Sequence, residues 1–205
     1  MKLYFSPGAC SLAPHIILRE LELPFEAVRV DLKHKSEHFK KLNPKGYVPV
    51  LVTSQEKILT EAAVILQYLA DLKPEKNLFP KAGWERYKGS ETLHFISTEF
   101  HKTLGPLWSL SKTISNAEGA EQYRKAVIEK MSKNFHLMAD NLKKNTFVLG
   151  PQFTICDAYL YTVLTWTRPL KIDLSPWPEL IGYLESIGQR PAVQLAAKTE
   201  GLKTT

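Results

Sequence analysis

The chain has 205 residues, of which 44% are hydrophobic and 23% charged, as in an ordinary globular protein with a sizeable core. Its two cysteines form neither a Cys-x-x-Cys pair nor a metal-ligand spacing, which excludes a disulfide framework or a zinc site and predicts a reducing, cytoplasmic setting. The net charge of +6 is scattered, and no segment has the length of a membrane span, so we expect no nucleic-acid partner and no membrane insertion.

Up to about residue 72, strand-like and helix-like segments alternate. The predicted elements are, in chain order, a strand over 3–5, a helix over 11–21, a strand over 27–31, a polar stretch over 33–41, a hairpin of 48–52 with 58–59, and a helix over 61–72. This order, βαβ followed by ββα, predicts one small mixed sheet with helices packed on it.

The composition changes after residue 72. A polar, proline-marked connector over 73–80 separates the first domain, 1–72, from a second that is helical throughout, 81–205. Helices are expected near 84–110, 118–143, 155–170, 177–186 and 192–197. The predicted fold class is therefore an α/β domain followed by an all-α domain.

Thr154 and Asp157 have the spacing of a capping box at the start of the third of these helices. The Thr154 hydroxyl would accept from the Asp157 N–H, while the Asp157 carboxylate would reach back to the Thr154 N–H. Cys156 lies inside this box and is followed by apolar and aromatic residues, so we interpret it as a core residue rather than a reactive thiol.

Cys10 follows a short strand and a Pro-Gly turn and stands at the start of a helix. The free N–H groups and the positive end of the helix dipole favour a thiolate there, and the thiolate is the reactive form of sulfur. Cys10 is therefore a candidate nucleophile or redox centre. The alternative is that it is a small buried apolar residue.

A proline opens an apolar strand in the segment Asn43-Pro-Lys-Gly-Tyr-Val-Pro49. Since proline has no N–H for a ladder, Pro49 belongs at a strand start, and Val48 is biased towards extended backbone. A cis bond between them would aim neighbouring backbone groups at an extended peptide, although the sequence alone does not indicate the cis form.

Thr60-Glu61-Ala62 ends a strand and opens a helix. The helix N–H groups suit a carboxylate and the Glu61 side chain suits an ammonium group, as in the α-amino-acid end of a ligand. The simpler interpretation is a capping threonine and a favourable first-turn acid. The basic Lys-His-Lys run at 33–35 would meet a second carboxylate unless it is merely a solvated loop.

The helix predicted over 84–110 has two faces. One is an apolar stripe, and the other carries residues suited to a cleft: His94, Thr98, His101, Gly105 and Trp108. Pro106 removes a backbone donor and predicts a kink near 102–105. The alternative for His101 is an ordinary surface histidine.

The chain resembles a cytosolic glutathione transferase, and the bacterial beta class in particular. The resemblance extends over the whole chain and rests on the joint occurrence of the Cys10 turn, the 43–49 motif, Thr60-Glu61, the helical second half and the Thr-x-x-Asp box. It implies a thioredoxin-like domain that holds glutathione, an all-α domain that receives a hydrophobic substrate, and a homodimer packed through the first two helices of the second domain.

The resemblance also implies roles for individual residues. Cys10 would contact or bond the glutathione sulfur, Val48 before a cis Pro49 would pair with the cysteinyl unit, Glu61 and the Ala62 N–H would hold the γ-glutamyl end, and Lys35 would reach the glycyl carboxylate. His101 and Lys102 match the site-facing pair of the family, with Thr98 beside them. Many relatives carry serine where this chain has Ala62, which removes one hydroxyl contact.

The predicted activity is conjugation of glutathione to hydrophobic electrophiles in a pocket with Gly105, Trp108 and Trp166. Cys10 adds a capacity for thiol transfer or peroxide reduction, and because Ala13 stands where a resolving cysteine would be, release would need an external thiol. Tyr4 and Ser11 are alternative partners for the sulfur. Two other hypotheses stay open at this point: a noncatalytic binding protein on the same fold, and a nucleic-acid-associated module supported only by positive charge after residue 72.

Overall fold

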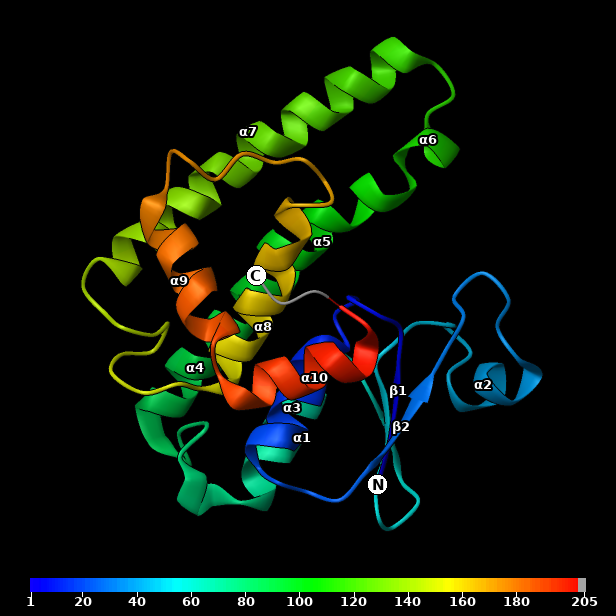
Figure 1. Ribbon diagram of the computed structural model, residues 1–205, viewed down its shortest axis with the longest axis vertical. Helices are drawn as coiled ribbons and strands as arrows, with labels where there is room; N and C mark the ends of the chain where they lie inside the picture. Colours follow the sequence, from blue (N-terminus) through cyan, green and yellow to red (C-terminus); the bar gives the residue numbers. More distant parts are fainter. Residues whose placement is uncertain (203–205) are drawn as a thin grey trace.

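The computed structural model describes residues 1–202 and confirms the predicted succession of an α/β part and a helical part (Figure 1). The elements of the first part are β1 (Lys2–Phe5), α1 (Leu12–Glu20), β2 (Glu26–Arg29), α2 (Glu37–Leu42), β3 (Val50–Val52), β4 (Ile58–Thr60) and α3 (Ala62–Leu72). A single 3-10 turn, η1 (Pro74–Lys76), follows α3.

The four strands form one mixed sheet in the order β2-β1-β3-β4. Strand β1 is parallel to β2 and antiparallel to β3, and β4 pairs antiparallel with β3. Because successive side chains point to opposite faces, Leu3 and Leu51 enter the main core, whereas Tyr4 and Val50 pack with Phe39 of α2. Helices α1 and α3 thus lie on one face of the sheet and α2 on the other.

Helix α2 begins within the 33–41 stretch, for which the sequence predicts only polar character, and ends one residue beyond it. Its N-cap is Ser36, whose hydroxyl accepts a hydrogen bond from the Phe39 N–H at 3.2 Å. Phe39 is only 2% exposed and fixes the helix to the sheet. A six-residue helix with so few apolar positions has too weak a periodicity to be predicted from sequence.

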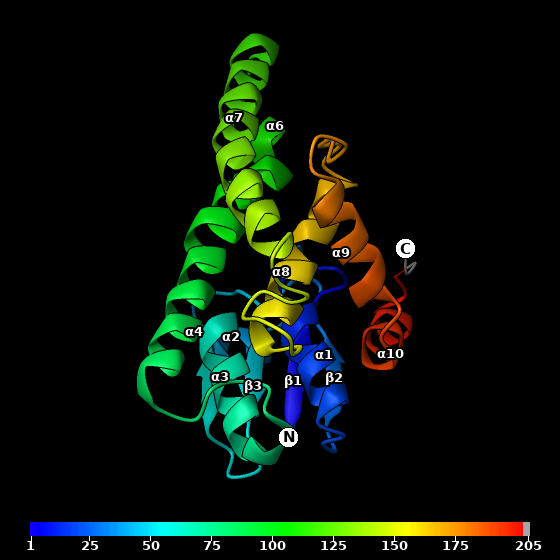
Figure 2. The same cartoon turned by 90° about the vertical axis from the view of Figure 1, so that its left-hand side faces the viewer.

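The second part is helical throughout. Its elements are α4 (Gly83–Phe95), η2 (Ile96–His101), α5 (Lys102–Leu104), η3 (Gly105–Ser109), α6 (Leu110–Thr113), α7 (Ala117–Leu142), α8 (Ile155–Leu164), η4 (Thr165–Thr167), α9 (Pro178–Gly188) and α10 (Pro191–Glu200). Helices α6 and α7 extend away from the sheet (Figure 2).

The helix predicted over 84–110 is therefore not continuous. Segment η2 is a π-helix and η3, which contains Pro106, is a 3-10 helix. A proline has no N–H to donate, so the regular α-helical pattern fails around it. The helix type changes first at Ile96, ten residues before Pro106, and again at Gly105.

Helix α8 is buried along its whole length and begins with the predicted capping box. One oxygen of Asp157 accepts from the Thr154 N–H at 2.7 Å and from its hydroxyl at 2.8 Å. The other oxygen accepts from the Val148 N–H and the Tyr183 hydroxyl. Cys156 is fully buried in this helix, so it is a core residue.

Helix α1 connects the two parts of the molecule. It packs against α3 on the sheet and against α8 and α10 of the helical part, and both views show α10 beside it (Figures 1 and 2). The turn between β1 and α1, residues 6–11, consequently lies where the two parts meet.

Candidate active site

A cleft of about 890 Å³ separates the carboxyl end of β1 and the loops beside it from the helical part. The first wall comes from the β1–α1 turn, the 43–49 segment and the start of α3. The second comes from η2, α5, η3, α8 and η4. The cleft contains ten of the predicted site residues: Cys10, Val48, Pro49, Glu61, Ala62, His101, Lys102, Gly105, Trp108 and Trp166.

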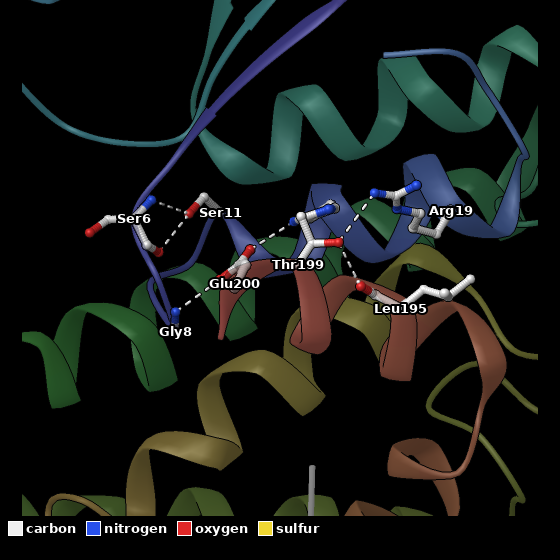
Figure 3. A network of polar contacts seen from close by, with 8 residues as sticks. Ser6, Gly8, Ser11, Arg19, Leu195, Thr199 and Glu200 are labelled. Carbon is white, nitrogen blue, oxygen red and sulfur yellow. Dashed lines mark hydrogen bonds and ion pairs between the residues drawn. The ribbon is translucent and has the colours of Figure 1, made fainter. Parts of the chain in front are cut away.

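The β1–α1 turn is fixed from several directions. Gly8 has a φ of +70°, its N–H donates to Glu200 Oε2 at 2.9 Å, and its carbonyl accepts from Trp166 Nε1 at 2.8 Å. Figure 3 shows Glu200 reaching this turn from α10, and Ser11 bonded to both backbone groups of Ser6. Ser11 is therefore occupied in closing the turn and is not free to act on a ligand sulfur.

Cys10 lies at the base of the cleft with 8% of its surface exposed. Its Sγ donates to the Val48 carbonyl at 3.3 Å. Burial raises the pKa of the thiol to about 12, and the opposing effects of its own N–H, of Lys102 and of the Ser11 N–H are smaller. Burial thus opposes the thiolate expected at the helix start, because the loss of hydration outweighs the helix-end N–H groups.

The 43–49 segment forms the lower rim of the cleft. Asn43, which is 2% exposed, accepts from the Lys45 N–H and donates through Nδ2 to the Tyr47 carbonyl at 2.8 Å. The Val48-Pro49 peptide bond is cis. Asn43 was not predicted as a site residue, although an asparagine before a proline and a glycine is a recognisable turn signal.

Glu61 precedes α3 in the left-handed backbone region, with a φ of 68°, and its side chain is exposed at the cleft. Lys45 Nζ lies 2.5 Å from Glu61 Oε1 and 3.3 Å from the Thr60 hydroxyl. The hydrogen bond from Lys45 lowers the pKa of Glu61. Sequence reasoning missed Lys45, and its place within the Asn-Pro-Lys-Gly motif was the available signal.

The helical wall differs from the predicted face. His101, Gly105 and Trp108 line the cleft, whereas Thr98 is exposed outside it and bonds back to the His94 carbonyl. The Lys102 N–H donates to the Ser97 carbonyl, five residues back, so the π turn shifts the register of the helix. Positions before this turn are rotated away from those after it, and Ser97 rather than Thr98 reaches the cleft.

His101 is half-buried at the centre of the helical wall. Its Nδ1 lies 2.7 Å from the Tyr159 hydroxyl, and its ring meets Trp166 edge-on at 5.0 Å between centroids. Trp166 in turn meets Trp108 edge-on at 6.1 Å. Burial, assisted by the charge of Lys102, lowers the pKa of His101 to about 4, so the ring is neutral at physiological pH.

Two further residues named from the sequence lie away from the cleft. Lys35 rests beside Gly46, where a Cβ would come within 3.1 Å of its Nζ, and it is not among the lining residues. The Tyr4 hydroxyl lies 3.3 Å from His38 Nε2, on the face of the sheet covered by α2. Tyr4 is thus a core residue and not a partner for the sulfur.

Across residues 1–202, no group of three or more His, Cys, Asp or Glu side chains is arranged to hold a metal ion. Within the same part of the chain, none of the helices combines the length and apolar character needed to cross a membrane.

Family models match both parts of the chain. The glutathione S-transferase N-terminal domain covers residues 8–72, and the glutathione S-transferase C-terminal domain covers residues 83–191. The chain is similar to glutathione S-transferase GstA of Escherichia coli O157:H7, with 39% identity over 99% of this chain and 100% of the relative.

Solved structures agree with the sequence matches. A sphingomonad glutathione S-transferase complexed with glutathione has a TM-score of 0.89 and 39% identity, over 99% of this chain and 100% of its own. The bacterial beta class transferase of Sphingomonas chungbukensis has a TM-score of 0.89 and 38% identity over the same shares. The chain therefore belongs to the glutathione S-transferase family, and it is a transferase with a thioredoxin-like N-terminal domain, an all-helical C-terminal domain and bacterial beta-class structural neighbours.

Proposed function

We propose that this transferase conjugates glutathione to hydrophobic electrophiles in the cleft, with residues 1–72 holding glutathione and residues 81–205 holding the electrophile. The observation that carries the proposal is the composition of the two walls. One wall offers a carboxylate and a helix N-terminus, and the other offers the Trp108 and Trp166 rings around His101.

The γ-glutamyl end of glutathione belongs at Glu61. Lys45 holds Glu61 Oε1, and the second oxygen is left to accept from the ligand ammonium group. The Ala62 N–H, at the start of α3, suits the α-carboxylate. The backbone of Val48, before the cis Pro49, would pair with the cysteinyl unit, which brings the glutathione sulfur towards Cys10 and His101.

In conjugation, the glutathione thiol gives its proton to water and the thiolate attacks the electrophilic carbon. A C–S bond forms, and the leaving group departs with the electron pair of its own bond to that carbon. Catalysis here consists of stabilising the thiolate and holding it beside the electrophile. The positive charge of Lys102 helps to stabilise the thiolate. The apolar wall with Gly105 helps to hold the electrophile beside it.

Thiol transfer at Cys10 is a second candidate, supported by the position of this thiol in the same cleft. The Cys10 thiolate would attack a glutathione disulfide, releasing one thiolate, and an external thiol would then reduce the mixed disulfide. The high pKa of Cys10 makes this the slower activity at neutral pH. We therefore assign Cys10 chiefly to contact with the glutathione sulfur as a neutral thiol.

We also propose a homodimer packed through α4 and α7. Trp84 and Tyr87 on α4 are 72% and 71% exposed, and their rings lie side by side with centroids 6.5 Å apart. Such an aromatic pair is unusual on a free surface. Sedimentation of the wild-type protein and a Trp84→Lys, Tyr87→Lys variant would test this, and a wild-type monomer would contradict it.

The experiment that tests the function is calorimetric titration of the reduced protein with glutathione, followed by conjugation assays with chlorodinitrobenzene. We expect saturable binding that Glu61→Ala weakens and turnover that a Trp108→Ala variant reduces through the KM for the electrophile. Glu75→Ala, an exposed position outside the cleft, is the matched control. Absence of glutathione binding at millimolar concentration would contradict the proposal.

A further inference from the structure

A second cavity, of about 350 Å³, lies where the two parts of the molecule meet, and it shares no lining residue with the active-site cleft. Its walls come from the end of α1, the connector at 76–78, the α7–α8 loop at 147–153 and Arg190, which precedes α10. This volume is near the lower end of the range for small-molecule sites. The cavity therefore suits a small ligand.

Arg190 is held in this wall in one orientation. Its Nε donates to Glu20 Oε1 at 2.7 Å, and its guanidinium carbon lies 4.0 Å from the centroid of the Phe153 ring. Phe153 is itself fixed, because it is 7% exposed and meets Phe147 edge-on. A planar guanidinium that is held at one edge and over one face keeps its remaining donors pointing in a single direction.

The remaining donors of Arg190 are open to a ligand. Within residues 1–202, neither of its Nη groups makes a hydrogen bond, and neither is among the buried polar atoms that lack one, so solvent reaches both. Lys76 lines the same cavity, is exposed, and has no ion-pair partner in that part of the chain. Since the parallel N–H groups of a guanidinium match the two oxygens of a carboxylate, these two residues suit a carboxylate ligand.

Glu20 supplies an opposite charge beside these donors. Its Oε1 is bonded to Arg190, whereas its Oε2 has no hydrogen bond among the described residues and is still reached by solvent, although the side chain is only 17% exposed. A partly buried carboxylate oxygen attracts a cationic donor more strongly than one in bulk water. Because Glu20 and Arg190 are bonded to each other, their open groups are neighbours, as the ammonium and carboxylate groups are in an α-amino acid.

The rest of the lining is apolar or carries a neutral amide. Leu78 is 7% exposed, and its carbonyl accepts from the Ile155 N–H at 2.9 Å, which fixes the connector to the start of α8. The apolar members of the lining are Leu78, Phe147, Pro151 and Phe153, and the amides are those of Asn77 and Gln152. An apolar surface next to an open donor fork and an open carboxylate oxygen matches an amino acid with a hydrophobic side chain.

We propose that this cavity binds a free α-amino acid that has an apolar or aromatic side chain. Arg190 and Lys76 hold its α-carboxylate, and Glu20 Oε2 accepts from its α-ammonium group. The side chain lies against Phe147 and Pro151. An organic anion without the ammonium group would leave the Glu20 oxygen beside the ligand without a partner, so the site discriminates against it.

NMR titration of labelled wild-type protein with L-phenylalanine tests the site. We expect saturable shifts of the Arg190 Nε–H and the Phe153 amide, with a Kd on the order of 1 mM, whether or not S-methylglutathione is present. 3-Phenylpropanoate lacks the ammonium group and phenethylamine lacks the carboxylate, so each should bind at least about tenfold more weakly. Equal binding of 3-phenylpropanoate would overturn the assignment to an amino acid, and the absence of saturable shifts would overturn the site itself.

Two carboxylates distinguish this cavity from the cleft, because Glu61 is expected to bind the ammonium group of glutathione. Glu20→Gln keeps an oxygen that can accept from Arg190 but removes the charge, so the Kd for phenylalanine should rise about tenfold while glutathione affinity changes less than about twofold. Glu61→Ala should have the reverse effect. Phenylalanine affinity that falls with Glu61→Ala and not with Glu20→Gln would place this ligand in the cleft and refute the proposal.

Two milder variants test the carboxylate end. Lys76→Ala removes an exposed side chain and leaves the ion pair of Glu20 and Arg190 in place, so it should weaken phenylalanine binding about threefold without unfolding the protein. Arg190→Lys keeps the positive charge but loses the donor fork, and should weaken binding further. Glu121→Gln, at an exposed position of α7 outside both cavities, is the matched control. Unchanged affinity in both Lys76→Ala and Arg190→Lys would contradict the proposed orientation of the ligand.

Discussion

Alkylation of Cys10 offers a quantitative test of how burial controls this thiol. Iodoacetamide reacts with the thiolate, so its rate follows the fraction of Cys10 that is ionised. The structure places the thiol at the base of the cleft with its pKa raised from 9.0 to about 12. We therefore expect slow modification at neutral pH and a steep increase on going to alkaline pH.

The expected size of the effect combines two factors. A rise of about three pKa units lowers the thiolate fraction at neutral pH about 1000-fold relative to an unperturbed thiol. A more basic thiolate is intrinsically more reactive. With a Brønsted coefficient of about 0.4–0.5, the rate constant of the thiolate itself is roughly 15–30 times higher. The net rate at neutral pH should be about 30- to 70-fold below that of the same chain unfolded in denaturant.

Mass spectrometry of the native protein over time measures this rate, with Cys10→Ala as the control for modification at the fully buried Cys156. Restricted access slows the reaction by the same factor at every pH, so the slope with pH is decisive. We expect about a tenfold increase per pH unit between about pH 8 and pH 10. A plateau in the native protein below about pH 9.5 would show that the helix-end N–H groups outweigh burial, and would refute the reasoning.

Three further predictions concern binding and stability. Glu61→Gln should weaken glutathione binding about tenfold in calorimetry, because it replaces a charge-assisted contact with a neutral one. Unchanged affinity would show that the γ-glutamyl end binds elsewhere. Asp157→Ala leaves the donors of Thr154, Val148 and Tyr183 unpaired, so chemical denaturation should show a loss of about 3–5 kcal/mol, whereas Thr154→Ser should lose less than about 1 kcal/mol. Glu200→Gln replaces the carboxyl group that contacts the buried His15 with an amide and should cost about 1–3 kcal/mol; an unchanged denaturation midpoint would count against that contact.

Much of the fold was predictable because its signals are local. The hairpin of β3 and β4 follows from two apolar runs around a polar turn, and the start of α8 follows from the spacing of Thr154 and Asp157. Helix α2 was missed because its stability comes from Phe39 packing on the sheet, which is a tertiary contact that six residues of sequence do not display.

The site was harder to predict where it depends on geometry beyond one helix turn. Counting along an ideal helix placed Thr98 in the cleft, and the π turn before Lys102 replaced it with Ser97. The electrostatic argument for Cys10 considered the helix end but not the burial of the thiol, which depends on residues far along the chain. Lys45 contacts Glu61, and Tyr159 contacts His101, only in the folded chain, so the sequence does not display these pairs.

The double anchoring of Gly8 has a consequence for the order in which the protein becomes active during synthesis. Gly8 leaves the ribosome near the beginning of translation, whereas its two anchors, Trp166 and Glu200, are added 158 and 192 residues later. The sheet and α1 can assemble while the chain is still growing, but the turn that presents Cys10 lacks its supports until α10 has emerged. A nascent chain stalled before residue 200 should therefore fold its first domain and still lack a properly formed cleft.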